Sequence, residues 1–159
     1  MKFSILDWKR GELLFVVGVI VIVAGVSFWQ VKLGEVKTRD AQRKADTELV
    51  ARSLRSYYEV WGSYPAGEGG EIRACGRDGG ELCKWGGGEI KDADGVVYLK
   101  KLPQDPMADR GYFYVFEPGE AGRSFRIYAG LENRRDAAYK SGLTMSCGVT
   151  VQCSWYVEN

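Results

Sequence analysis

The four cysteines are the residues of this sequence best suited to covalent chemistry: Cys75, Cys83, Cys147 and Cys153. Their spacings are C-x7-C and C-x5-C, whereas zinc ribbons use C-x2-C pairs, so a metal knuckle is disfavoured. An even number of cysteines favours disulfides and an oxidising compartment. Of the three possible pairings we favour the local one, because each pair closes a short loop that contains glycine. Four unpaired thiols in a cytosolic domain are the alternative.

Few other residues could carry chemistry. The chain has no histidine, which removes the commonest general base and the commonest zinc ligand. No phosphate-binding glycine motif occurs in the glycine-rich segment 62–95. We therefore expect no catalytic residues, no cofactor site and no enzyme activity. Charges nearly cancel, with 22 basic against 21 acidic residues, so nothing points to a nucleic-acid partner.

An uncharged apolar run, Leu13 to Val31, predicts a transmembrane helix. At about 1.5 Å per residue it covers roughly 28 Å, close to the hydrocarbon thickness of a bilayer. Trp29 stands where an interfacial aromatic residue is expected. A cleaved secretory signal is the alternative, although its apolar region is usually shorter. Basic residues flank both ends of the run, so the cysteines decide the orientation and place the C-terminal domain outside the membrane.

The apolar run continues without a break into an amphipathic helix. One face carries apolar residues at helical spacing: Val50, Leu54, Tyr57, Tyr58 and Trp61. Gly62 and Pro65 end the helix. We expect the apolar face to pack on the C-terminal domain.

The charged residues of this helix are expected on its other faces. Asp40 with Lys44 and Glu48 with Arg52 have the favourable acid-before-base order at i, i+4. A solvated surface is the ordinary interpretation of such a charge run, and contact with neighbouring subunits is the alternative.

Segments after the helix predict an α+β fold, with a long N-terminal helix packed on a small antiparallel sheet. Alternating aromatic and aliphatic residues favour strands within 95–106, 111–120, 123–132 and 146–157. A sheet this small needs a helix on one face to be stable. The expected organisation is a leader-like segment 1–11, a transmembrane helix 12–33, its amphipathic continuation 34–61, a glycine-rich loop 62–95, and a sheet with a disulfide loop 96–159.

The order and spacing of several motifs resemble the type IV pilin-like superfamily, and within it the major pseudopilins of type II secretion. The motifs are the hydrophobic-to-amphipathic helix, YYEVWGSYP (Tyr57–Pro65), LPQDP (Leu102–Pro106), GYFYVF (Gly111–Phe116) and IYAGLEN (Ile127–Asn133). The resemblance implies a non-enzymatic subunit held in the bacterial inner membrane and assembled, with its own or related subunits, into a helical filament of a pilus or pseudopilus. A monomeric extracellular binding module on a membrane-anchored stalk is the alternative.

The resemblance also implies processing and assembly residues. Prepilin peptidase cuts after a glycine that follows basic residues, so Gly11 is the candidate cleavage site and Glu12 the candidate new N-terminus. The family has phenylalanine at that position and glutamate at the fifth mature position, whereas this chain has Glu12 and Val16. Glu12 is a candidate partner for a neighbouring N-terminal amine. The candidate assembly residues are Glu12, Leu13, Leu14, Phe15 and Val16.

Major pseudopilins carry a calcium ion in their C-terminal loops. Asp92 and Asp94, in the segment KDADG, are a fragment of a calcium-binding loop that lacks its later carboxylates. They are weak calcium candidates, and exposed loop acids are the alternative.

Overall fold

The computed structural model describes residues 10–117 and 124–159. Within them one helix, α1 (Arg10–Trp61), precedes eight short strands. The strands are β1 (Gly67–Glu68), β2 (Glu71–Cys75), β3 (Glu81–Cys83), β4 (Ile90–Lys91), β5 (Val97–Leu99), β6 (Phe113–Glu117), β7 (Ser124–Ala129) and β8 (Trp155–Glu158). The predicted α+β class, a long N-terminal helix with small antiparallel sheets, is confirmed.

The chain divides into two compact units, one ending at Thr38 and the other covering Arg39–Asn159. Helix α1 contributes to both units. It ends where the sequence predicts, because Gly62 adopts the left-handed conformation (φ +67°) and its N–H donates to the Tyr58 carbonyl at 2.8 Å. A residue with a side chain rarely adopts this conformation, so glycine makes the stop sharp.

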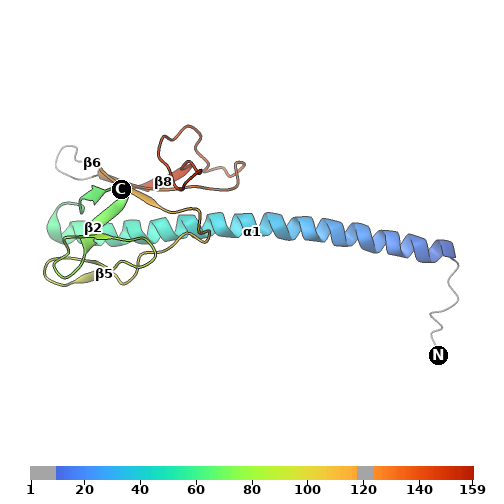
Figure 1. The fold of residues 1–159 in the computed structure, drawn as a ribbon, viewed down its shortest axis with the longest axis horizontal. Coiled ribbons are helices and arrows are strands. Elements are labelled where there is room, and N and C mark those ends of the chain that lie inside the picture. The colour runs from blue at the N-terminus through green and yellow to red at the C-terminus, as the bar shows by residue number, and fades with distance from the viewer. Residues whose placement is uncertain (1–9, 118–123) are drawn as a thin grey trace, which may run out of the picture. The chain divides into compact units, whose positions relative to one another are not determined.

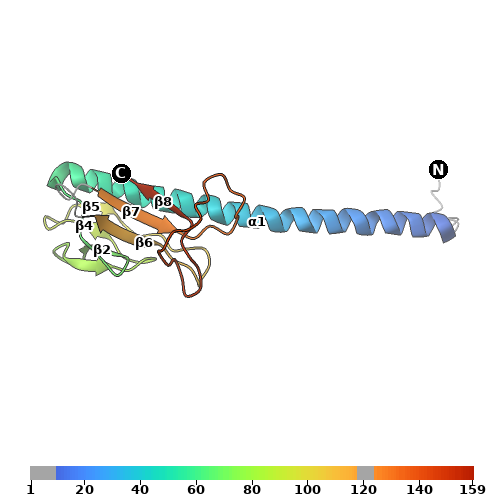
Figure 2. The ribbon, with the colours of Figure 1, turned by 90° about the horizontal axis from the view of Figure 1, so that it is seen from above.

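In the second unit, the strands gather around the C-terminal part of α1 (Figure 1). Strand β7 lies between β6 and β8, and both pairings are antiparallel (Figure 2). Side chains alternate along β7, so Phe125, Ile127 and Ala129 face the core. The core joins them to the helix residues Val50 and Leu54. A second, smaller apolar cluster holds Tyr128, Cys147 and Cys153.

The glycine-rich segment 62–95, predicted as a loop, contains short strands. It contains the three-stranded antiparallel sheet β1-β2-β3 and strand β4. Ile72 and Ala74 alternate into the core from β2, and glycines with positive φ occupy the turns that join these short strands. The many glycines here mark tight turns between short strands. Strands this short contain too few residues to show a clear alternation of apolar and polar side chains.

The two disulfides have the local pairing favoured by the sequence. Cys75 joins Cys83 across β2 and β3, and Cys147 joins Cys153 within the loop before β8. Each closes a loop of fewer than ten residues, with sequence separations of 8 and 6. Such links stabilise the fold mainly by limiting the freedom of the unfolded chain.

The packing of α1 on the strands predicts different consequences for its two leucines in the second unit. Leu54 is fully buried, whereas the side chain of Leu49 is 41% exposed. We expect Leu54→Ala to lower the free energy of unfolding by about 2–5 kcal/mol, because it leaves a cavity in the core. Leu49→Ala is the matched control and should cost well under half as much. Chemical denaturation of the full chain in detergent, followed by tryptophan fluorescence, measures both; equal losses would contradict this packing.

Candidate functional site

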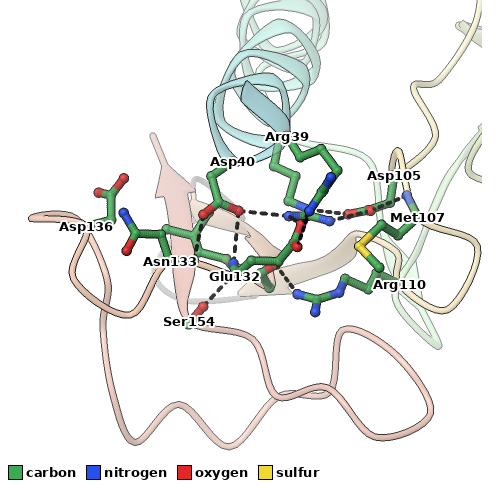
Figure 3. Close-up of polar contacts among 12 residues, drawn as sticks. Arg39, Asp40, Asp105, Met107, Arg110, Glu132, Asn133, Asp136 and Ser154 are labelled. Atoms are coloured by element: carbon green, nitrogen blue, oxygen red, sulfur yellow. Dashed lines mark hydrogen bonds and ion pairs between the residues drawn. The ribbon is translucent and has the colours of Figure 1, made fainter. Parts of the chain in front are cut away.

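Five charged residues meet where α1 crosses two loops of the second unit. We call them the charge cluster: Arg39, Asp40, Arg43, Asp105 and Glu132. Three come from α1, Asp105 precedes β6, and Glu132 follows β7 (Figure 3). Two guanidinium groups therefore meet three carboxylates.

Arg43 is the centre of the charge cluster and has no exposed surface. Its Nε and Nη2 donate to the two oxygens of Asp105, at 2.8 and 2.9 Å. Its Nη1 donates to Asp40 at 2.8 Å and to Glu132 at 2.7 Å. Burial alone would lower the pKa of the Arg43 guanidinium, but its three carboxylate partners outweigh that effect and raise the pKa. Arg43 therefore remains charged, and its fork geometry fixes three carboxylates at once.

The carboxylates in turn fix the loop backbones. Asp40 accepts hydrogen bonds from the N–H groups of Glu132 (2.9 Å) and Asn133 (2.8 Å), which follow β7. Asp105 accepts one from the N–H of Met107 at 2.9 Å. The charge cluster therefore satisfies backbone donors in two loops as well as neutralising charge, which a purely apolar contact could not do.

Glu132 is held by a second arginine. Arg39 donates from Nε and Nη2 to its two oxygens, at 2.8 and 2.6 Å. The hydrogen bonds from Arg39 lower the pKa of the Glu132 carboxyl, burial opposes them, and contacts with Arg43 add to the lowering, so the pKa falls to about 2. Glu132 is consequently ionised at all ordinary pH values.

The charged residues of α1 were predicted to form a solvated surface, and this prediction is wrong for residues 39–44. Arg39, Asp40, Arg43 and Lys44 turn toward the strands and loops, and Lys44 pairs with Asp136 at 2.7 Å. Neither predicted i, i+4 pair forms, because Asp40 pairs with Arg43. Glu48 pairs instead with Arg55 at 3.1 Å. Lys44 is taken by Asp136 from a loop distant in sequence, whereas Asp40 and Glu48 pair with other arginines of α1. Helix pairs at i, i+4 are worth only a few tenths of a kcal/mol, so such competing partners readily replace them.

The weak calcium candidates lie in a hydrogen-bonded turn. Asp92 is buried, and its Oδ1 accepts from the N–H groups of Asp94 and Val96. Its Oδ2 accepts from Trp61 Nε1 at 3.2 Å and Tyr98 Oη at 2.8 Å. Burial works to raise the pKa of Asp92, but these hydrogen bonds outweigh it and lower the pKa. Within the described residues no group of three or more His, Cys, Asp or Glu could hold a metal ion.

The candidate processing and assembly residues lie at the start of α1, in the first unit. Gly11 and Glu12 occupy its first turn, where an acidic side chain complements the positive end of the helix dipole. Leu13, Leu14 and Phe15 are exposed, whereas Val16 is half-buried.

The exposed apolar surface continues along the same helix, through Leu33. Helix α1 is long and apolar enough to cross a membrane, and none of its most apolar 18-residue window is buried. The structure thus assembles the charge cluster, which the sequence did not predict, and leaves the predicted assembly residues without a partner in the described part of the chain.

No protein-family model, curated protein or solved structure matches this chain. The pilin-like resemblance therefore remains a prediction from the motifs.

The charge cluster predicts a large loss of stability when Arg43 is removed. Arg43→Met should lower the free energy of unfolding by about 3–5 kcal/mol, because it leaves buried carboxylates without their cation. Arg52→Met is the matched control: Arg52 lies on the same helix, is exposed, and makes no ion pair within the described residues. It should change stability by less than about 0.5 kcal/mol. Urea denaturation at pH 7 compares the two, and a loss below about 1 kcal/mol for Arg43→Met would refute the assigned role.

Glu132 predicts an acid-dependent part of the stability. Its pKa is about 2 in the folded chain against an ordinary 4.5, so its contribution is complete above about pH 4.5 and disappears as the pH falls toward 2. Glu132→Gln cannot titrate, so the variant should lose stability less steeply over this window than the unmodified chain. Free energies of unfolding between pH 6 and pH 2 measure the two slopes; parallel curves would show that Glu132 is not held ionised by its arginines.

Proposed function

We propose that this chain is a structural subunit of a type IV pilus or a type II secretion pseudopilus. The observation that carries the proposal is helix α1 itself. Its residues from Leu13 to Leu33 present exposed apolar side chains all round, whereas residues from Asp40 onward pack against strands and loops. The motif resemblance described above supports the same assignment.

An apolar surface of this extent needs an environment that excludes water. Burying a single valine, leucine, isoleucine or phenylalanine side chain stabilises by roughly 1.5–3 kcal/mol, and many such residues are exposed here. A bilayer supplies that environment for a single helix, and a bundle of identical helices supplies it in a filament core. A subunit that moves from the bilayer into a filament core needs a helix that is apolar on all sides in both places.

The two disulfides support an external location for the second unit. Disulfides persist in oxidising compartments and are rare in the cytosol. With the apolar segment crossing the inner membrane, the N-terminus would face the cytoplasm and the C-terminal domain would lie outside. Under this proposal Gly11 is the processing position, and Glu12 begins the mature chain and faces a neighbouring subunit.

Site-specific photo-crosslinking tests the proposal. A benzophenone amino acid at Phe15, which is 73% exposed, should yield a ladder of dimers, trimers and larger species after irradiation of intact cells. The matched control places the same group at Val149, which is 95% exposed in the disulfide loop, and should give no ladder. A chain that remains monomeric at Phe15 would refute the filament role and favour a monomeric membrane-anchored module. N-terminal sequencing of the same preparation, without reducing agent, tests cleavage after Gly11.

A further inference from the structure

The loop that follows β7 has a basic outer surface. Within residues 131–140, which we call the basic loop, Arg134, Arg135 and Lys140 are exposed. Among the described residues none of these three side chains makes an ion pair with a carboxylate. The Lys140 ammonium lies 3.5 Å from the centre of the Tyr156 ring, a contact that leaves its charge in place. Three positive charges are therefore available to a partner from outside the chain.

The acidic residues near the basic loop are already paired. Asp136 pairs with Lys44 at 2.7 Å and accepts a hydrogen bond from the N–H of Ala138 at 2.8 Å. Glu132 is held by the two arginines of the charge cluster. The charge cluster and the Lys44–Asp136 pair together hold three basic and four acidic residues. With the three exposed bases the count is six basic against four acidic residues, so the net charge is +2 and only basic groups lack a partner.

The basic loop is fastened to the part of the second unit that follows the apolar segment in sequence. Asp40 holds the backbone of the loop through the N–H groups of Glu132 and Asn133 (Figure 3). Asp40 follows Leu33, the last large exposed apolar residue of the segment, by seven residues. Seven helical residues rise about 10.5 Å, which is about one Debye length at 0.1 M salt. Bases at this separation interact with lipid headgroups when the segment spans a bilayer.

The membrane topology does not account for this positive charge. Bases that follow a membrane span usually mark its cytoplasmic side. Under the proposed function the two disulfides place the second unit on the opposite side. Anionic phospholipids account for the charge at either side of the membrane. Arginine suits their phosphate groups, because its guanidinium donates two parallel hydrogen bonds in a planar fork.

We propose that the basic loop binds the headgroups of anionic phospholipids in the membrane that the apolar segment of α1 spans. Arg134 and Arg135 donate to phosphate oxygens, and Lys140 adds a third positive charge. The inference rests on the membrane anchoring contained in the proposed function and is independent of filament assembly. The contact holds the second unit at the membrane surface, and it weakens as salt rises because exposed charges are screened.

Fluorescence quenching by labelled headgroups tests the inference. A fluorophore is attached at Ala137→Cys, an exposed position in the basic loop, and the full chain is placed in nanodiscs. Some of the phosphatidylcholine headgroups carry a nitroxide quencher. One set of nanodiscs contains phosphatidylcholine alone, and the other also contains about one third phosphatidylglycerol. We expect about twofold stronger quenching with phosphatidylglycerol at about 0.05 M salt, and we expect this excess to disappear at about 0.5 M salt.

Charge variants identify the residues responsible. Arg134→Gln combined with Arg135→Gln should abolish the excess quenching. The matched control is Arg77→Gln combined with Lys84→Gln, which removes two exposed bases from the turns that flank β3 and should keep the excess. An equal loss in the control would show that only the net charge of the chain matters, and it would overturn the assignment to the basic loop.

The outcomes separate this inference from the proposed function. Equal quenching in the two kinds of nanodisc at low salt, with the Phe15 ladder intact in cells, would overturn the inference and leave the filament role standing. Excess quenching without a ladder would support the headgroup contact and refute the filament role. A chain that does not enter nanodiscs would overturn the membrane anchoring on which both depend.

Discussion

The burial of the Arg43 guanidinium is the constraint on which the second unit depends. Removing one cation and three carboxylates from water costs several kcal/mol per ion, and only close, multiple hydrogen bonds offset that cost. The charge cluster provides them, because Nε, Nη1 and Nη2 of Arg43 each donate to a carboxylate oxygen at 2.7–2.9 Å. Once α1 is placed so that Arg43 is satisfied, the loops before β6 and after β7 have fixed positions.

This arrangement reverses the usual distribution of side chains on an amphipathic helix. Asp40 and Arg43 are directed inward beside Val50 and Leu54, so one face of α1 uses ion pairs near its start and apolar packing nearer its end. The inward charges are stabilised only when their partners lie at fixed positions, whereas the apolar residues require only a surface of complementary shape. The helix consequently gains both specificity of register and burial.

The sequence predicted the elements better than the contacts between charged residues. Periodicity found α1 and its end at Gly62, and alternation placed strands near β6 and β7, because both signals are local. The charge cluster was missed because Asp105 and Glu132 are more than 60 residues from Arg43. One signal was available: Arg43 and Thr47 continue the spacing of Val50 and Leu54 backward along the same face. The short strands in 62–95 were missed because strands of two or three residues show too little alternation.

The two halves of α1 depend on their surroundings in different ways. Residues from Arg39 onward are held by ion pairs, an apolar core and two disulfides within one unit. Residues from Leu13 to Leu33 have exposed apolar surface, and its free energy depends on what replaces water around it. A change of environment therefore acts first on the apolar half of the helix. That separation is the physical property that the proposed filament subunit requires, because such a subunit passes from a membrane into an assembly.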